Sequence, residues 1–298
     1  MNIPPMVDSF DALAYLGANP DVAAAVAEGR VHSAWSHFVN HGFREDRGGV
    51  PGSVLAKVRA VMGISASPPP AKLIARVHGT SEPAGFEQVG RTIALDVYAA
   101  AGSLVDLDRP LRILDFGCGC GRVLRYMAEV APASTIHGSD IDREAIAWCE
   151  GEFRREIERG RLSFTVNGDH PPTTFAADSF DLVYAISVFT HLPEDLQLQW
   201  LGELGRVLKP GGIAVLTTQG GALIRRHLDA GQARQFDEKG FHYFPYGSTE
   251  GLPEYYQSAW HDGAYIDRVW SQYFEVISKT PGGVAGHQDL ILCRKRLG

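Results

Sequence analysis

The chain of 298 residues has few cysteines, no cluster of basic residues and no long apolar run. Its four scattered cysteines are too few for a disulfide framework. Residues 1–11 lack the basic and apolar regions of a signal peptide. No apolar stretch approaches the roughly eighteen residues that a membrane-spanning helix needs. We therefore expect a cytoplasmic protein that keeps its thiols reduced and makes no membrane contact.

The formal net charge is −7 and the pI is near 5.9. Nucleic-acid binding normally requires a basic patch or stripe, so this balance argues against nucleic acid as a partner. Cys118 and Cys120 have a spacing that resembles half of a metal site, but the chain has no second pair of this kind. We therefore expect no metal. A chain of this length buries a large core.

The most informative stretch is LRILDFGCGCG at residues 111–121. Its first half is a short apolar run, which is typical of a strand covered on both faces. Gly117, Gly119 and Gly121 have no Cβ, so the backbone can turn tightly and approach a ligand closely. The pattern predicts a nucleotide-binding turn between a strand and a helix.

A second short strand, predicted at 135–138, is followed by Asp140, about twenty residues after the last glycine. An acid at this position can accept both ribose hydroxyls of a bound nucleoside. The alternative is that the glycines only form a turn and that Asp140 caps the helix beginning near residue 143.

The rest of the chain alternates strands and helices, which predicts an α/β fold with a doubly wound, mostly parallel sheet. Two late strands with a glycine-rich turn between them should pair as an antiparallel hairpin. The predicted strands are 112–116, 135–138, 162–166, 182–186, 213–217, 273–278 and 289–294, and the helices 85–101, 122–131, 143–153 and 194–207.

Residues 9–47 read as three short helices, with apolar residues such as Leu13, Val22 and Phe38 available for a small core. The proline-rich stretch 66–71 is expected to be extended. We predict an N-terminal helical module over 1–62, a linker over 63–71 and the main domain over 72–298.

Five motifs in order resemble class I S-adenosylmethionine-dependent methyltransferases over about residues 72–298. They are LDFGCGCGR, HGSDID with Asp140, VNGDH with Asp169, FDLVYAISVFTHL at 180–192 and LKPGG at 208–212. The resemblance implies a Rossmann-like, seven-stranded sheet. Separately, YLGANPDVAAA followed by HFVNHGFRE resembles a helical module of bacterial surface-glycan and surface-layer associated proteins. A helical cap that only protects the main domain is the alternative.

The resemblance implies S-adenosylmethionine as cofactor. Asp115 would hold its amino group, Asp140 its ribose and Asp169 its adenine, and main-chain amides at the helix start would suit its carboxylate. The expected cofactor-binding residues are Asp115, Gly117, Cys118, Gly119, Gly121, Asp140, Ile141, Gly168, Asp169, His170 and Ser187.

His191 follows the fourth strand in a loop that lies beside the transferring methyl in this fold, so it is the first candidate base. Alternatively, it only hydrogen-bonds the loop backbone. His261 and Asp262 form a second candidate pair, because a carboxylate can raise the basicity of an imidazole. The long segment 219–265 is predicted to bind substrate. Its candidate residues are His242, Tyr243, Tyr246 and Tyr255.

The expected function is methyl transfer to a small molecule or glycan, at oxygen. The segment after the fourth strand lacks an Asn-Pro-Pro-Tyr type of signature, which argues against methylation of nucleic acid or glutamine. Two alternatives remain open. One is a nicotinamide-dependent oxidoreductase, which shares the glycine turn and Asp140. The other is a non-catalytic adaptor of glycan assembly that keeps the nucleotide fold as a scaffold.

Overall fold

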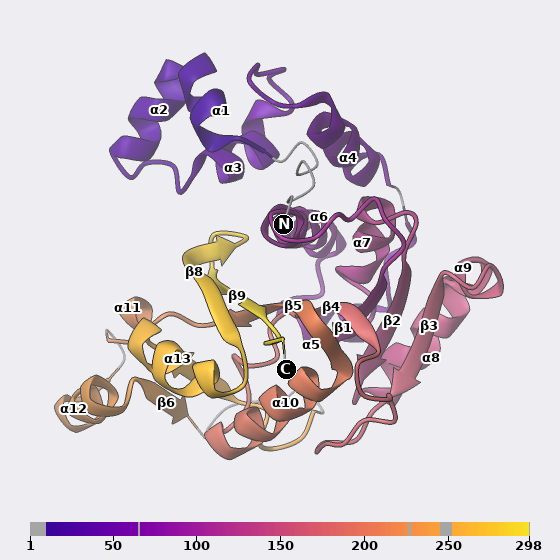
Figure 1. Cartoon of the computed structure of the whole chain (residues 1–298), viewed down its shortest axis with the longest axis vertical. Helices are drawn as coiled ribbons and strands as arrows, with labels where there is room; N and C mark the ends of the chain where they lie inside the picture. Colours follow the sequence, from indigo (N-terminus) through magenta and orange to yellow (C-terminus); the bar gives the residue numbers. More distant parts are fainter. Residues whose placement is uncertain (1–9, 65, 226–227, 245–251, 298) are drawn as a thin grey trace.

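The computed structural model describes residues 10–64, 66–225, 228–244 and 252–297. Its centre is a seven-stranded sheet with the order β3-β2-β1-β4-β5-β9-β8 (Figure 1). Strands β1 to β5 are parallel, and β9 runs antiparallel to both β5 and β8. The strands are β1 (Arg112–Phe116), β2 (Thr135–Asp140), β3 (Leu162–Val166), β4 (Phe180–Ala185), β5 (Leu208–Thr218), β8 (Glu275–Val284) and β9 (Gln288–Arg294).

Both faces of the sheet are covered, as the apolar strand segments predict. Ile113 of β1 packs in one hydrophobic cluster with α6 (Pro83–Gly102) and α7 (Leu124–Val130). Its neighbour Leu114 packs in a second cluster with α10 (Glu194–Val207). Successive side chains of a strand point to opposite faces, so one short run serves both layers. The predicted doubly wound, mostly parallel architecture is confirmed.

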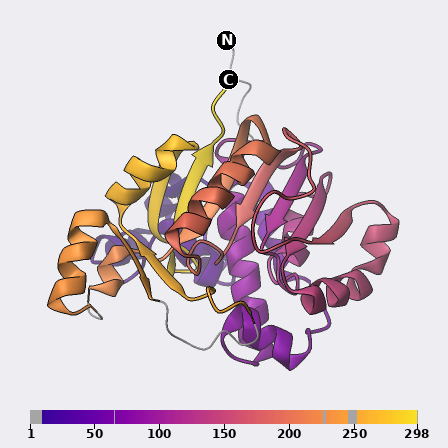
Figure 2. The same cartoon turned by 90° about the horizontal axis from the view of Figure 1, so that it is seen from below.

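The helices α8 (Arg143–Glu152) and α9 (Arg154–Glu158) lie near the β3 edge. At the β8 edge lie α12 (Ala230–Lys239) and α13 (Gly263–Val269), followed by the 3-10 turn η2 (Trp270–Gln272), so the two groups flank the sheet (Figure 2). The antiparallel hairpin is confirmed, but β8 continues to Val284, with a register shift, through residues predicted to form the turn.

The N-terminal helices are α1 (Ala12–Ala18), α2 (Pro20–Ala27), α3 (Ala34–His37), the π-helical turn η1 (Phe38–Gly42) and α4 (Gly52–Met62). Tyr15 is 0% exposed in their core. Leu13, which was expected there, is 82% exposed. Two residues of a helix that are two positions apart point to nearly opposite sides, so burial of Tyr15 turns Leu13 outward.

The N-terminal helices pack on the same hydrophobic cluster as the sheet (Figure 1). The Trp35 Nε1 atom donates to Asp96 Oδ1 of α6 at 2.9 Å, and the Ala285 amide donates to Asp96 Oδ2 at 2.8 Å. Burial raises the pKa of Asp96 to about 7. The helices are therefore docked on the main body, and the division into domains stays a prediction.

The described part of the segment 219–265 contains several regular elements. They are α11 (Gly221–Ile224), α12 and a small antiparallel sheet of β6 (Phe241–Phe244) and β7 (Ser258–His261). A further helix, α5 (Ala71–His78), follows the proline-rich stretch. Across the described ranges, no helix combines the length and apolar character needed to cross a membrane.

Candidate active site

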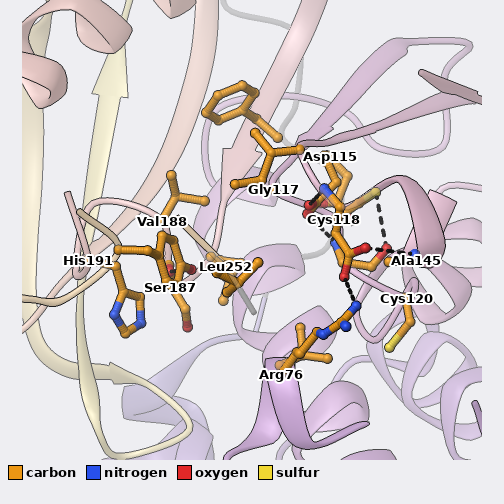
Figure 3. Close-up of a pocket in the computed structure, with 18 of the residues that line it drawn as sticks. Arg76, Asp115, Gly117, Cys118, Cys120, Ala145, Ser187, Val188, His191 and Leu252 are labelled. Carbon is orange, nitrogen blue, oxygen red and sulfur yellow. Dashed lines mark hydrogen bonds and ion pairs between the residues drawn. The ribbon is translucent and has the colours of Figure 1, made fainter. Parts of the chain in front are cut away.

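A pocket lies where β1, β2 and β4 end, and α5 closes its side (Figure 3). Parallel strands bring their carboxyl ends to one edge of a sheet, which is where ligands bind in such folds. Figure 3 shows Ser187, Val188 and His191 on one side of the pocket and Asp115, Cys118 and Cys120 on the other.

The three glycines of the turn all have positive φ angles. A Cβ on Gly117 would lie 2.3 Å from Val188 Cγ2, and one on Gly119 would lie 2.7 Å from Val77 Cγ1. A Cβ on Gly121 would lie 2.9 Å from Phe153 Cε2. The turn therefore requires glycine both for its backbone conformation and for the close approach of its neighbours.

The main-chain amides of the turn are largely used within the protein. Gly117 and Cys118 both donate to the Ser139 carbonyl, at 2.7 and 3.1 Å, and Gly121 donates to the Cys118 carbonyl at 2.9 Å. Gly119 donates to Asp140 Oδ2 at 2.7 Å. Main-chain amides were expected to hold a ligand carboxylate, but the amides at these four positions already have partners within the protein.

Asp140 ends β2 with both carboxylate oxygens engaged by the backbone. Oδ2 accepts from Gly119, and Oδ1 accepts from the Asp142 amide at 2.8 Å. Burial raises the pKa of the Asp140 carboxyl. Each carboxylate oxygen can accept a second hydrogen bond, so two donors on one ligand can be held at once.

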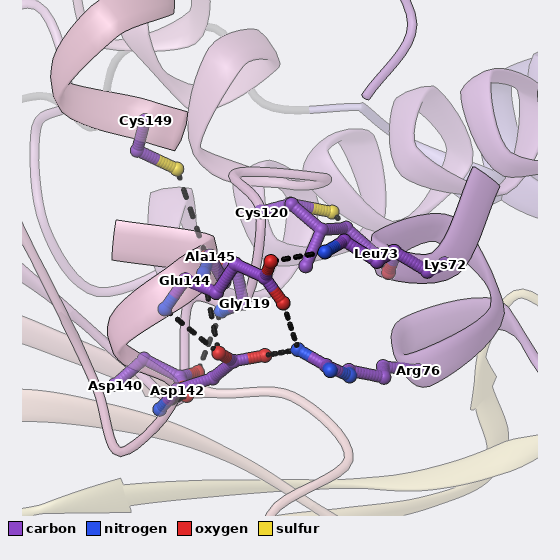
Figure 4. Close-up of polar contacts among 10 residues, drawn as sticks. All are labelled: Lys72, Leu73, Arg76, Gly119, Cys120, Asp140, Asp142, Glu144, Ala145 and Cys149. Atoms are coloured by element: carbon purple, nitrogen blue, oxygen red, sulfur yellow. Dashed lines mark hydrogen bonds and ion pairs between the residues drawn. The ribbon is translucent and has the colours of Figure 1, made fainter. Parts of the chain in front are cut away.

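The capping role considered for Asp140 belongs to Asp142. The Oδ1 atom of Asp142 accepts from the amides of Glu144 and Ala145, at 3.0 and 3.2 Å, at the start of α8. Its Oδ2 atom accepts from Arg76 Nη1 at 2.7 Å (Figure 4). Asp140 is thereby free to face the pocket, and the alternative interpretation is not supported.

Helix α5 is fixed over the glycine turn by charge and by packing. Arg76 also reaches Glu144 at 3.1 Å, and Lys72 forms an ion pair with Glu144 (Figure 4). Leu73 packs in a small buried cluster with Cys120. The sequence analysis missed α5, although Lys72 and Arg76 stand four residues apart and so share one helix face.

Asp115 is the last residue but one of β1 and is 2% exposed. Its Oδ2 atom has no hydrogen-bond partner among the described residues. Burial raises the pKa of the Asp115 carboxyl to about 8. Tyr184 and Arg122 lower this pKa, but less than burial raises it. A cationic donor in the pocket would further stabilise the buried carboxylate.

Arg122 follows the glycine turn and is 7% exposed, a position that the sequence analysis did not single out. Its Nη1 atom donates to the Val77 carbonyl of α5 at 2.7 Å, while its Nε atom has no partner. In the described part of the chain no carboxylate forms an ion pair with it. Burial lowers the pKa of its guanidinium.

The loop after β4 carries Ser187, whose φ is +61° and whose amide donates to Thr217 Oγ1 at 2.8 Å. The Tyr256 hydroxyl donates to the Ser187 carbonyl at 2.9 Å, and Gln288 Nε2 donates to Ser187 Oγ at 2.9 Å. These contacts fix the loop from three separate elements. Gln288 was not among the predicted site residues.

His191 is oriented by the same segment. Its Nδ1 atom lies 2.7 Å from the Gln257 carbonyl, and its ring stacks on Tyr256 with centroids 4.4 Å apart. A carbonyl only accepts, so the proton is assigned to Nδ1, and Nε2 is left as an acceptor. Burial lowers the pKa of His191. His191 therefore makes a backbone hydrogen bond through Nδ1, and its Nε2 atom can still act as a base.

The pocket brings together most of the predicted cofactor residues. Gly121 lies behind the turn against Phe153, and Gly168 and His170 are exposed and outside the lining. Tyr246 lies outside the described residues. The predicted residues that do line the pocket are Asp115, Gly117, Cys118, Gly119, Asp140, Ile141, Asp169, Ser187, His191 and Tyr255.

The proposed His261–Asp262 pair is not at the pocket. His261 is 2% exposed in β7, its Nε2 atom lies 2.8 Å from Gln197 Oε1, and burial lowers its pKa to about 3. Asp262 caps α13 by accepting from the Tyr265 amide at 2.7 Å. Both side chains therefore have structural roles, because adjacent residues at a strand end diverge.

Two of the predicted substrate residues also lie elsewhere. His242 and Tyr243 of β6 line a separate hollow with Lys239 and Arg268. Tyr243 acts on the pocket only indirectly, because its hydroxyl donates to the Tyr255 carbonyl at 2.6 Å. Tyr255 itself lines the pocket.

Residues 113–212, a third of the chain, match the family model described as "Methyltransferase domain". These residues run from the glycine turn through the His191 loop to β5. The strand order confirms the predicted Rossmann-like fold, and the match shows that residues 113–212 resemble a methyltransferase domain.

The curated relatives match over the same region. "Methyltransferase GfsG" of Streptomyces halstedii is 32% identical over 36% of this chain and 37% of its own length. "Sterol 24-C-methyltransferase erg-4" of Neurospora crassa is 36% identical over 36% of this chain and 27% of its own. "Fatty-acid O-methyltransferase" of Mycolicibacterium smegmatis is 30% identical over 42% of each. The chain thus spans well under half the length of these relatives.

A solved structure supports the fold. The 1,6-didemethyltoxoflavin-N1-methyltransferase of Burkholderia thailandensis, with bound S-adenosylhomocysteine, has a TM-score of 0.51 to this chain. The likeness covers 78% of this chain and 92% of the other, at 16% sequence identity. At this identity it bears on the fold alone.

Proposed function

We propose that the protein is an S-adenosylmethionine-dependent methyltransferase. The observation that carries the proposal is the pair of acids at neighbouring strand ends: Asp140, held by two amides with acceptor capacity left, and Asp115, buried with an unbonded oxygen. Asp140 would accept the ribose hydroxyls, and Asp115 would accept the ammonium group. Asp169, at the pocket rim, would accept from the adenine amine.

When bound, the cofactor would supply a methyl group on a sulfonium sulfur. The sulfur keeps the electron pair of the broken carbon–sulfur bond and becomes the neutral thioether of the product. The chain aligns the acceptor with the methyl group, and alignment can contribute as much as about 7 to 11 kcal/mol. Tyr256 and Gln288 hold the Ser187 loop in place. For a hydroxyl acceptor, the free Nε2 atom of His191 takes the proton while Nδ1 stays anchored on Gln257.

We propose oxygen as the methylated atom and a small molecule or glycan as the acceptor. The free nitrogen of His191 supports oxygen, and so does the name of the fatty-acid relative. The sterol relatives carry names of carbon methyltransferases at similar identity, so carbon methylation is the second candidate. The glycan option rests on the N-terminal sequence pattern.

The first test is a calorimetric titration of the full chain with S-adenosylhomocysteine. We expect saturable one-to-one binding. A nicotinamide-dependent oxidoreductase would instead bind reduced nicotinamide dinucleotide and change its fluorescence, and we expect no change. Binding of the homocysteine product with no turnover on any acceptor would favour the adaptor.

Cofactor binding is expected to release a proton at pH 7. The pKa of Asp115 in the empty pocket is about 8, so its carboxyl is mostly protonated at pH 7. A bound ammonium group stabilises the carboxylate and lowers this pKa, which expels the proton. Titrations in two buffers of different ionisation enthalpy measure the release. The Asp115→Asn variant should show none, and a wild-type signal independent of buffer would contradict the assignment.

Replacing His191 with glutamine is expected to lower kcat by about 10² to 10⁴ while changing affinity for S-adenosylhomocysteine much less. The base must be neutral, and burial lowers its pKa below 6.5. The wild-type rate should therefore persist at pH 6.5 and fall only at lower pH. His41→Gln, an exposed histidine in η1, serves as the control and should keep both the rate and the pH profile. Equal rates for His191→Gln and wild type would remove His191 from the chemistry.

A further inference from the structure

A second hollow continues from the cofactor pocket. Arg122, Ser187, His191 and Tyr256 line both spaces, so they form the boundary between them. The far wall of the second hollow is made by Val89 and Ile93 of α6, the end of α5 and the β8–β9 connection. His191, the candidate base, is therefore part of the lining of this hollow.

The two spaces differ in charge. Four aspartates line the cofactor pocket: Asp115, Asp140, Asp142 and Asp169. Among the described residues, no aspartate or glutamate lines the second hollow, whereas two arginines and three histidines do. One of these arginines, Arg76, is already paired with carboxylates of the α8 end. Arg122 has no direct ion pair among the described residues, and its charge is offset only by the attraction of Asp115 from the cofactor side.

The fold holds the Arg122 guanidinium in place. A Cβ on Gly90 of α6 would lie 2.5 Å from the Arg122 carbonyl and 3.1 Å from its Cγ, so the helix leaves room for this residue. The Val77 carbonyl binds Nη1, while Nε has no partner. A buried guanidinium without a directly paired anion is unfavourable, and it gains most from a carboxylate that its planar fork can bind.

We propose that the acceptor is an anionic molecule whose carboxylate is anchored by Arg122 in the second hollow. The inference rests on the proposed methyltransferase function and names the class of its acceptor. The apolar wall of α6 suits an amphiphilic molecule, with its charged end at Arg122 and its reactive group toward His191. Among the described residues the second hollow has no carboxylate in its lining, so an anion meets no like charge there.

The test compares two probes of equal size, 3-phenylpropanoate and its primary amide, by ligand-detected NMR titration of the protein saturated with S-adenosylhomocysteine. We expect the acid to bind at least about tenfold more tightly than the amide, because a charge-assisted pair is lost in the amide. High salt should weaken binding of the acid but not binding of the amide. This arm uses only the wild-type protein.

Variants then assign the preference. Arg122→Gln should bind acid and amide equally, while Arg122→Lys keeps part of the preference. Arg91→Gln removes the same charge from α6 outside the hollow and should keep the full preference. Melting curves establish that the variants fold. If Arg122→Gln does not fold, the effect of salt on acid binding to the wild type decides whether the preference is electrostatic.

Three results would overturn the inference. They are equal binding of acid and amide to the wild type, no binding of either, or a loss of tenfold or more in S-adenosylhomocysteine affinity in Arg122→Gln, which would assign the guanidinium to the cofactor. If the wild type does not bind S-adenosylhomocysteine at all, the proposed function fails instead. The same acid and amide titration on the free protein then still decides whether Arg122 forms an anion site.

Discussion

Replacing Asp140 with alanine is expected to weaken binding of S-adenosylhomocysteine by about 10² to 10⁴-fold. Each hydrogen bond from a ribose hydroxyl to the carboxylate contributes about 1.5 to 3 kcal/mol, and two such bonds are lost. The amides of Gly119 and Asp142 also lose their acceptor, so the glycine turn is less well held. Calorimetry on the full chain measures the effect.

Asp169→Ala provides the matched control, because Asp169 is an exposed acid at the rim of the same pocket. Its removal should reduce affinity by less than about tenfold, since water already solvates that carboxylate. Asp140→Asn keeps an acceptor for one amide, so its loss of affinity should lie between those of Asp140→Ala and Asp169→Ala. If affinity survives in Asp140→Ala with the fold intact, the nucleoside binds elsewhere and the pocket assignment is wrong.

Gly117→Ala is expected to destabilise the protein by about 2 to 5 kcal/mol and to abolish cofactor binding. The left-handed backbone costs a non-glycine residue about 1 to 2 kcal/mol. The added methyl group must also displace Val188, whose Cγ2 atom lies 2.3 Å from the new Cβ position, and overpacking costs about 1 to 3 kcal/mol. Val188 lines the pocket, so its displacement changes the site itself.

Gly160→Ala separates the two causes. Gly160 has a φ of +70°, close to the +78° of Gly117, but nothing lies within 4 Å of its Cβ position. It should lose only about 1 to 2 kcal/mol of stability and bind cofactor normally. Adding Val188→Ala to Gly117→Ala should recover part of the lost stability. Denaturant unfolding measures both, and equal losses at Gly117 and Gly160 would contradict a role for the close contact.

The sheet and the cofactor end of the pocket follow from local patterns in the sequence. The predicted bounds of β3 and α10 agree with the structure, because apolar runs and helical periodicity act over a few residues. The same holds for the glycine turn and for Asp140. The sequence left open whether Asp140 binds a ligand or caps α8, and the structure assigns the cap to Asp142.

The acceptor side depends on contacts between distant segments. Arg76 meets Asp142 across 66 positions, and the Tyr256 hydroxyl meets the Ser187 carbonyl across 69. No local pattern reports such pairings. At His261 the sequence predicted a catalytic residue that the structure does not place at the pocket. Its side chain is buried and contacts Gln197 instead.

By itself, the sequence determined the layered α/β fold, the glycine turn and the acids at the strand ends, because each depends on short-range periodicity and backbone conformation. Only the tertiary structure decided that α5 closes the pocket, that His191 keeps Nε2 free, and that Arg122 is buried without a carboxylate between two differently charged spaces. Burial and partnership are properties of the packed chain, and they set the charge and chemistry of the site.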